Sequence, residues 1–144
     1  MELELRELTE TERALQVYDI YKHCMYMPTE ERFIRKMTGY IDDCGVRIFE
    51  CLCHGQTKGV IVISLSNTAK AEILGIATDE NVRGMGIGSY MIKRVSQIHP
   101  LSQVYAETDS DAVGFYQKNG FEIVEEKQVF GDEKVSRYKC TLEI

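Results

Sequence analysis

Three glycines at alternate positions, Gly84, Gly86 and Gly88, lie between a predicted strand and a predicted helix. Glycine leaves the neighbouring backbone N–H groups uncovered, so several of them can converge on one ligand. The positive end of the dipole of the following helix points to the same place. Arg83 adds a cation directly before the first glycine. This combination predicts a phosphate-binding loop, and a pyrophosphate is its natural occupant.

Two common nucleotide-binding loops and a simple turn are the alternatives. A P-loop requires a lysine between glycine and serine at the helix start, and Gly88-Ser89 lacks it. The dinucleotide fingerprint requires a third glycine where this chain has Ser89, and no acidic residue ends a strand at the expected distance. A simple turn would not require so many glycines, because each one costs backbone entropy. The segment therefore predicts a phosphate loop of another kind.

The cysteines and histidines do not form a recognisable reactive cluster. The five cysteines are an odd, scattered set, and this argues against a disulfide framework. Cys51-Leu52-Cys53-His54 has no second pair at the spacing of a zinc site, so we predict no metal site and interpret these cysteines as small buried side chains. We expect surface positions for the histidines, which are His23, His54 and His99.

The apolar periodicity predicts the elements that hold the glycine-rich loop. Leu3 and Leu5 indicate an opening strand, and Thr9-x-x-Glu12 predicts a capping box at the start of a helix that Pro28 ends. A second helix is expected from residue 29, followed by helices at 86–98 and 111–118. Further strands are expected at 46–53, 57–66, 70–78, 104–108, 121–129 and 135–142, with turns at 54–56, 66–68 and 131–132.

This order of elements predicts an α/β (α+β) fold with a mixed sheet and helices on both faces. The chain has 144 residues, so we expect one domain over residues 1–144. The net charge is −6 without any run of Lys or Arg, which disfavours nucleic acid as a partner. No apolar run has the length of a membrane helix, and the acidic start of the chain is unlike a signal peptide. We therefore expect a cytoplasmic protein with no membrane partner.

Two segments resemble the Gcn5-related N-acetyltransferase (GNAT) superfamily. Arg83-x-x-Gly86-x-Gly88, preceded by a strand and a turn at Asp79, is similar to its acetyl-CoA pyrophosphate loop. Residues 106–121 resemble its later strand and helix, and they end in the signature Phe-Tyr-x-x-x-Gly-Phe. The similarity covers essentially the whole chain, more loosely before Val46.

The resemblance implies the acyl-CoA N-acyltransferase fold, with a mostly antiparallel central sheet of six to seven strands. It also implies acetyl-CoA as the co-substrate, no metal, and direct attack by a primary amine in a ternary complex. The pantetheine arm is then expected along the strand that ends at Thr78, with the pyrophosphate at the glycine-rich loop. The residues that the resemblance assigns to acetyl-CoA binding are Ile76, Ala77, Thr78, Arg83, Gly84, Met85, Gly86, Ile87, Gly88, Ser89 and Tyr116.

Acyl transfer to an amine requires an oxyanion donor, an acid for the leaving thiolate and a base for the amine. The resemblance assigns the backbone N–H of Ile76 as the oxyanion donor and Tyr116 as the general acid, because a phenol and a thiol have similar pKa values. Glu72 is a candidate base, acting through a water, since it lies four residues before Ile76 and so on the same side of a regular strand. Glu107, on the neighbouring strand, is the alternative. The sequence also fits a solvated role for Glu72 and a packing role for Tyr116.

Asp109 departs from the family pattern, in which many members have asparagine. Its carboxylate cannot donate a hydrogen bond and would repel a phosphate, so we expect it to cap the next helix through Ala112. Cys24 and Cys51 are conceivable acyl acceptors, but neither has an identifiable histidine partner, and direct transfer fits better.

Residues 24–29 are the expected wall of the acceptor site, although ordinary helix packing would explain them equally well. The acceptor itself is open: an amine on a small molecule or on a protein. The same fold could also hold acyl-CoA without turnover, as a sensor or regulatory module. The presence of Tyr116 together with the loop favours the enzyme. The closing strands could pair two subunits in a homodimer.

Overall fold

The structure is a computed structural model that describes residues 2–66 and 68–144. These residues form a seven-stranded sheet in the order β1-β2-β3-β4-β5-β7-β6, in which β4 and β5 are parallel and all other neighbours antiparallel. The strands are β1 (Leu3–Leu8), β2 (Val46–Cys53), β3 (Gln56–Leu65), β4 (Lys70–Thr78), β5 (Gln103–Thr108), β6 (Glu122–Phe130) and β7 (Glu133–Glu143). The predicted turn at 66–68 includes position 67, which lies outside the described residues.

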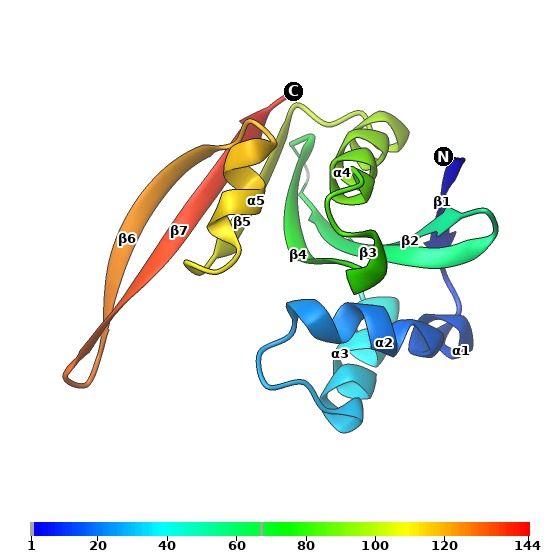
Figure 1. Cartoon of the computed structure of the whole chain (residues 1–144), viewed down its shortest axis with the longest axis horizontal. Helices are drawn as coiled ribbons and strands as arrows, with labels where there is room; N and C mark the ends of the chain where they lie inside the picture. Colours follow the sequence, from blue (N-terminus) through cyan, green and yellow to red (C-terminus); the bar gives the residue numbers. More distant parts are fainter. Residues whose placement is uncertain (1, 67) are drawn as a thin grey trace.

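Helices cover both faces of the sheet, with α4 and α5 on one face and α1–α3 on the other (Figure 1). Alternate strand residues pack on opposite faces. Phe49 and Ile61 thus contribute to the core beneath α4, and Ile48 and Val62 to the core beneath α1–α3. The predicted mixed, mostly antiparallel sheet is confirmed. The α-helices are α1 (Thr11–Ala14), α2 (Tyr18–Tyr21), α3 (Glu30–Asp42), α4 (Ile87–Ile98) and α5 (Val113–Lys118), and the 3₁₀ helices are η1 (Leu15–Val17), η2 (Lys22–Cys24) and η3 (Glu80–Val82).

The first helical region differs from its prediction. The capping box is wrong, because α1 begins only at Thr11, with Glu10 as N-cap, and the Glu10 side chain makes no capping hydrogen bond to a described residue. Leu8 is still a buried strand residue paired with Ile48, so Thr9 comes too early in the chain to cap the helix. The single helix expected before Pro28 is instead the succession α1, η1, α2 and η2.

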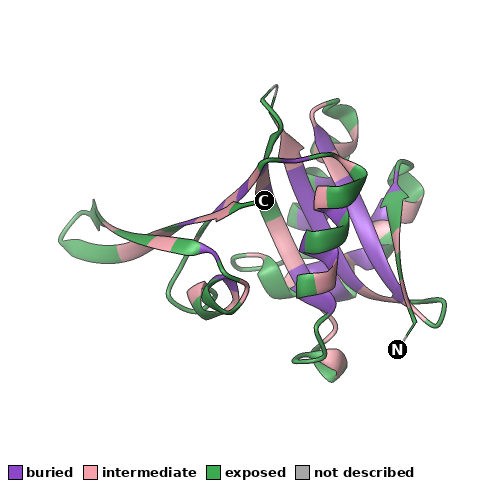
Figure 2. Ribbon diagram, turned by 90° about the horizontal axis from the view of Figure 1, so that it is seen from above, coloured by how far each residue is buried: buried purple, intermediate pink, exposed green. Residues whose placement is uncertain are grey.

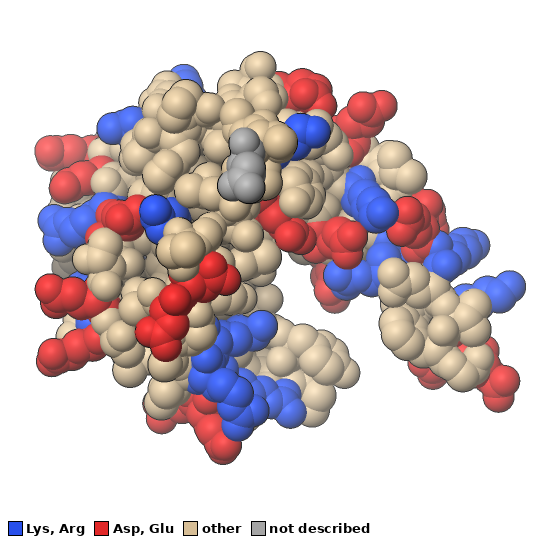
Figure 3. All heavy atoms as spheres, turned by 180° about the vertical axis from the view of Figure 1, so that it is seen from behind, with Lys and Arg blue, Asp and Glu red and all other residues tan. Residues whose placement is uncertain are grey.

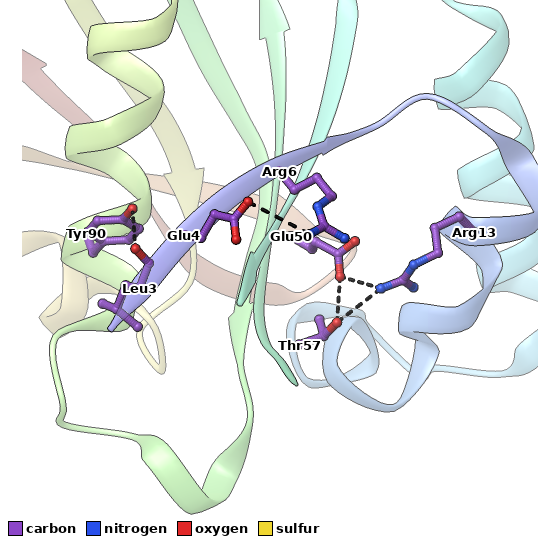
Figure 4. A network of polar contacts seen from close by, with 7 residues as sticks. All are labelled: Leu3, Glu4, Arg6, Arg13, Glu50, Thr57 and Tyr90. Atoms are coloured by element: carbon purple, nitrogen blue, oxygen red, sulfur yellow. Dashed lines mark hydrogen bonds and ion pairs between the residues drawn. The ribbon is translucent and has the colours of Figure 1, made fainter. Parts of the chain in front are cut away.

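A buried polar network joins the helices to the sheet (Figure 4). Glu50 of β2 is fully buried and accepts hydrogen bonds from Arg13 of α1 and Thr57 of β3. A carboxylate in such a place requires a cationic partner. The hydroxyl group of Tyr90 in α4 donates a hydrogen bond to the Leu3 carbonyl of β1 over 3.2 Å. Both helix layers are therefore connected to the β1–β3 part of the sheet.

The β6–β7 hairpin extends away from the rest of the molecule. Figure 2 shows buried residues along the central strands and mostly exposed or intermediate ones along the hairpin. The predicted turn at 131–132 joins its strands, and Gly131 there has a positive φ of 62°. None of the helices formed by the described residues combines the length and apolar character required to cross a membrane.

Candidate active site

β4 and β5 lie side by side over only part of their length. Among the described residues their pairing stops at Glu72 and Tyr105, whereas β4 continues to pair with β3 up to Thr78 and β5 with β7 up to Thr108. Backbone groups of residues 73–78 on the β5 side therefore have no strand partner. An unpaired strand edge can hydrogen-bond another extended chain. This opening is where the sequence predicted the pantetheine arm.

A β-bulge in β4 determines the direction of its side chains. The register changes between the pairs Val62–Gly75 and Ile63–Ile73, so Leu74 is an extra residue. Gly75 faces α2, and the hydroxyl group of Tyr21 occupies the space that a Cβ atom there would take. Position 75 consequently accommodates only glycine while Tyr21 is in place.

The bulge overturns one sequence prediction, because Glu72 and Ile76 do not point to the same side. Ala71 and Ile73 are in the core beneath α4, so Glu72 between them points to the α1–α3 side. The Ile76 side chain packs against the core beneath α4. The backbone N–H of Ile76, which is the predicted oxyanion donor, lies in the plane of the sheet at the level of the opening.

Glu72 and Glu107 lie on the same face of the sheet where β4 and β5 separate. Ala106 is in the core beneath α4, so the adjacent Glu107 points to the α1–α3 side, as Glu72 does. Burial raises the pKa of Glu72, and the charge of Glu107 raises it further. A carboxylate with a raised pKa is a stronger proton acceptor than an ordinary one. The structure thus brings together the two alternative bases that the sequence could not separate.

The glycines of the predicted phosphate loop serve two different purposes. Gly84 and Gly86 have φ values of 80° and 83°, a left-handed conformation that favours glycine. Gly88 has no such φ, but a Cβ added there would lie 2.6 Å from Cε1 of Phe115. Helix α5 therefore packs directly on the start of α4. Two glycines allow the turn, and the third allows the helices to approach.

The first N–H groups of α4 are available to a ligand. The helix begins at Ile87 with Gly86 as N-cap, and the N–H of Tyr90 makes the first helical bond, 3.0 Å from the Gly86 carbonyl. The N–H groups of residues 86–89 have no acceptor in the part of the chain that the structure describes. Arg83 likewise has no ion-pair partner among residues 2–66 and 68–144. These groups fit a diphosphate.

Tyr116 is buried on α5 among aromatic side chains. Its ring makes edge contacts with Phe115 and Phe121, with centroids 5.2 and 5.1 Å away. Burial raises the pKa of the Tyr116 hydroxyl, and Cys140 and Cys24 raise it further. The phenol is therefore protonated at neutral pH, as a general acid must be, although it is a weaker acid than a free phenol. Its catalytic role stays a prediction.

Cys24 lies beside Ile76, which the sequence did not reveal. η2 packs on β4, and the Cys24 thiol donates a hydrogen bond to the Tyr21 carbonyl over 3.2 Å. Burial raises the pKa of this thiol to about 11, while hydrogen bonds that involve Tyr21 and the Ile76 backbone, and the charge of Lys36, lower it. The residue as a whole is exposed, so only its sulfur is turned inward. Cys24 is thus a wall residue next to the predicted oxyanion donor.

Asp109 makes the predicted hydrogen bond to Ala112 but does not cap helix α5, because the N-cap is Ala112 itself and no side chain of a described residue caps it. Its Oδ1 accepts hydrogen bonds from the N–H groups of Asp111 and Ala112, at 3.0 and 3.1 Å. Helix α5 begins at Val113, two residues later than expected, because this turn comes first. Among the described residues, no group of three or more His, Cys, Asp or Glu side chains is placed to bind a metal ion. The cysteines are free. Cys51 is buried as expected, whereas Cys53 is only partly buried.

A family model described as an acetyltransferase (GNAT) domain matches residues 45–123. The chain therefore belongs to the GNAT acetyltransferase family, which confirms the resemblance seen in the sequence. No curated protein matches the sequence.

Solved structures of GNAT acetyltransferases share the fold. A GNAT family acetyltransferase from Elizabethkingia anophelis with acetyl-CoA bound is 18% identical, with a TM-score of 0.71 over 99% of this chain and 98% of that one. The ribosomal-protein-S18-alanine N-acetyltransferase from Escherichia coli is 16% identical, with a TM-score of 0.73 over 99% and 94%. An acetyl transferase from Salmonella typhimurium that modifies the N-terminal serine of ribosomal protein L7/L12 is 16% identical, with a TM-score of 0.77 over 99% and 95%.

Proposed function

We propose that the chain transfers an acetyl group from acetyl-CoA to a primary amine by direct attack in a ternary complex. One observation carries this proposal: the N–H groups of residues 86–89, which have no acceptor among the described residues, begin α4, the α-helix that follows β4, and the edge of β4 opens beyond Glu72. The first set of groups fits the diphosphate of acetyl-CoA, and the open edge fits its extended pantetheine arm. Family membership and the acetyl-CoA bound to one structural neighbour support the same ligand.

The residues around the opening have complementary roles in this reaction. Acetyl-CoA, when bound, supplies an acetyl group activated as a thioester. The Ile76 N–H donates to the carbonyl oxygen as negative charge develops there. Glu72, with its pKa raised by burial and by Glu107, accepts the proton of the amine from the α1–α3 side. Tyr116 approaches from the α5 side and protonates the departing sulfur.

Direct transfer is preferred over an acyl-cysteine intermediate. The raised pKa of Cys24, about 11, keeps its sulfur in the unreactive thiol form at neutral pH. We expect Cys24→Ala to retain turnover within about threefold, whereas loss of a covalent nucleophile costs several orders of magnitude. A loss of more than about a hundredfold, with the fold intact by circular dichroism, would show that the thiol takes part in the chemistry.

The proposed function is tested by binding and turnover together. Calorimetry is expected to show coenzyme A binding to the unaltered protein and none to Gly86→Glu, whose side chain would strain the turn and repel phosphate. Gly131→Glu is the matched control, since Gly131 also has a positive φ but lies in the distant hairpin turn. Thiol release from acetyl-CoA with a panel of amines then measures transfer. Failure to bind coenzyme A would refute the proposal, and binding without thiol release would indicate the non-catalytic sensor.

A further inference from the structure

The direction of the Ile76 N–H group depends on the bulge in β4. The Lys70 carbonyl accepts a hydrogen bond from the Ser66 N–H over 2.9 Å, so the backbone groups of Lys70 face the β3 side. The Asp79 N–H donates to the Lys58 carbonyl over 2.9 Å and therefore also faces β3. Every second residue of a strand faces the same neighbour, yet positions 70 and 79 are separated by an odd number of steps. The extra residue of the bulge accounts for this difference.

Because of the bulge, the Ile76 N–H group points into the opening beside β5. Alternation back from Asp79 directs the backbone groups of Ala77 and Gly75 to β3, and those of Ile76 to the opposite edge. In a strand without the extra residue, alternation onward from Lys70 would direct the Ile76 N–H to β3 instead. Under the proposed function, the oxyanion donor is therefore present in the opening only while the bulge is maintained.

Tyr21 of α2 lies against the bulge from the α1–α3 side. A Cβ atom at Gly75, directly after the extra residue Leu74, would overlap the Tyr21 hydroxyl oxygen and lie 2.7 Å from its Cζ atom. The three atoms nearest to that position all belong to Tyr21. The Tyr21 ring is buried and packs on Phe33 of α3, with the ring centroids 6.1 Å apart. Helix packing thus holds the hydroxyl group against the backbone of β4.

Hydrogen bonds also connect the Tyr21 hydroxyl to the next residue of β4. Burial raises the pKa of this hydroxyl, and the side chains of Cys24 and Tyr40, which share hydrogen bonds with it, raise it further. Burial also raises the pKa of the Cys24 thiol to about 11, whereas hydrogen bonds with Tyr21 and with the Ile76 backbone lower it. The hydroxyl is therefore linked to Ile76 through Cys24 as well as through the bulge.

Tyr21 does not lie on the surface from which the proposed substrates approach. Figure 3 shows a hollow between the β6–β7 hairpin and the layer of α1–α3, with acidic side chains at its head. Under the proposed function, the amine reaches Glu72 from this side of the sheet. Tyr21 is only 2% exposed, so its neighbours cover it and it does not line the hollow. An effect of Tyr21 on the reaction would thus pass through the backbone that it contacts.

We propose that Tyr21 is a positioning residue for acetyl transfer, because its hydroxyl maintains the β4 bulge and so keeps the Ile76 N–H directed at the thioester carbonyl. This inference rests on the proposed function. A carbonyl oxygen that acquires negative charge requires a donor that is fixed in place before the reaction. Displacement of such a group by about 1 Å can cost about a hundredfold in rate. Tyr21 contributes to the rate without contact with the reacting atoms.

Infrared spectroscopy of bound acetyl-CoA tests the position of the donor directly. A hydrogen bond to a carbonyl lowers its stretching frequency, and an isotope label in the acetyl carbonyl separates this band from those of the protein. We expect the band to move to lower frequency when acetyl-CoA binds to the unaltered protein. Tyr21→Phe removes only the hydroxyl group, and we expect it to abolish at least about half of this shift.

Tyr18→Phe is the matched control for the loss of a hydroxyl group. Tyr18 also lies on α2 and packs on Phe33, with the ring centroids 5.1 Å apart. It is not among the groups nearest to a Cβ atom at Gly75. The control variant should therefore leave the carbonyl shift unchanged.

Steady-state kinetics provide a second readout. Tyr21→Phe is expected to lower kcat about tenfold with any amine that serves as acceptor. Calorimetry should give a Kd for coenzyme A within about twofold of the unaltered value, because coenzyme A has no acyl carbonyl for the Ile76 N–H to bind. Tyr18→Phe should keep both quantities within about twofold.

A pair of substitutions tests whether the contact between Tyr21 and Gly75 is responsible. Gly75→Ala alone is expected to lower kcat about a hundredfold, since its Cβ atom would collide with Tyr21 and displace the strand. Tyr21→Leu removes the three atoms nearest to that Cβ position but keeps an apolar side chain in the core. In the Tyr21→Leu protein, Gly75→Ala should therefore cost less than about threefold more. An equal cost in both proteins would overturn the inference.

The outcomes distinguish the inference from the proposed function. A carbonyl shift and a kcat in Tyr21→Phe that match those of Tyr18→Phe would overturn the inference and leave the acetyltransferase function standing. Equal losses of kcat and of coenzyme A affinity in Tyr21→Phe would also overturn it, because support of the fold alone would explain them. Bound acetyl-CoA without a carbonyl shift in the unaltered protein would remove Ile76 as the donor and this inference with it. Failure of the unaltered protein to bind coenzyme A would overturn the proposed function itself.

Discussion

The two parts of the sheet on either side of β4 differ in how far their strands are paired, covered by helices and buried. β2 and β3 have neighbours on both edges, helices over both faces, and buried side chains along most of their length. β6 is an edge strand, and its residues are exposed or half-buried throughout. β4 belongs to the packed part because it pairs with β3 up to Thr78. On its other edge, its pairing with β5 stops at Glu72.

This difference separates positioning from recognition. The packed part fixes the Ile76 backbone and the start of α4, where small displacements would weaken the proposed hydrogen bonds to acetyl-CoA. The open part presents side chains that have few neighbours and can adapt to an acceptor. The proposed chemistry takes place at the border between them.

The largest expected effect comes from Tyr116, the side chain that α5 brings to this border. Tyr116→Phe removes the proposed proton donor while it keeps the ring contacts with Phe115 and Phe121. We expect turnover to fall by about 10² to 10³, with coenzyme A affinity within about threefold of the unaltered value. Steady-state kinetics and calorimetry measure the two quantities. Unchanged turnover would leave Tyr116 with a packing role alone.

Two salt bridges allow the stability of the two parts to be compared directly. Arg13→Ala leaves the fully buried Glu50 without its cation, and we expect the free energy of unfolding to fall by about 3 kcal/mol. Lys139→Ala removes an exposed pair with Glu126, and the expected loss is below about 0.5 kcal/mol. Urea unfolding measures both. Equal losses would mean that the packed part is not held more tightly than the hairpin.

The contact between α4 and α5 is sensitive to a single methyl group. Gly88→Ala would place a Cβ 2.6 Å from Cε1 of Phe115, so the ring and α5 must move. We expect a loss of about 1–2 kcal/mol in stability and about tenfold in turnover, because Tyr116 follows Phe115 in the helix. Gly114→Ala is the control within α5: its Cβ would meet nothing within 4 Å, and alanine favours a helix. If both variants behave alike, the close approach at Gly88 is unimportant.

The smallest effect concerns the pH dependence of kcat/KM. The pKa of Glu72 is raised first by burial and then by the charge of Glu107. Glu107→Gln removes the second cause, so Glu72 should ionise at a lower pH and the acidic limb should move down by less than about one pH unit. Because burial remains, the limb should stay above the range of an ordinary carboxyl. A limb that moves upward, or not at all, would argue against Glu72 as the base.

Features that depend on local pattern could be predicted from the sequence. The alternating glycines predict a tight turn before a helix, and the sequence predicts the hydrogen bond from Ala112 to Asp109, because both follow from short-range backbone requirements. Phosphate binding by the turn stays a prediction. The bulge at Leu74 could not be found from the sequence. An extra residue in β4 leaves the apolar run unchanged and changes only the face of the sheet to which the following side chains point. The position of Cys24 beside Ile76 could not be predicted either, because it arises when η2 packs on β4, a strand far away in the sequence.

The contact of Tyr21 with Gly75 limits how this protein can change during evolution. Any larger residue at position 75 collides with the Tyr21 hydroxyl, so a change at one position has to be accompanied by a change at the other. The exposed Tyr26 and Met27, a few residues along the same chain segment, face no such restriction. Under the proposed function, new acceptors can thus be acquired by substitutions at these exposed positions, while α2 stays packed on β4, the strand that carries the proposed oxyanion donor.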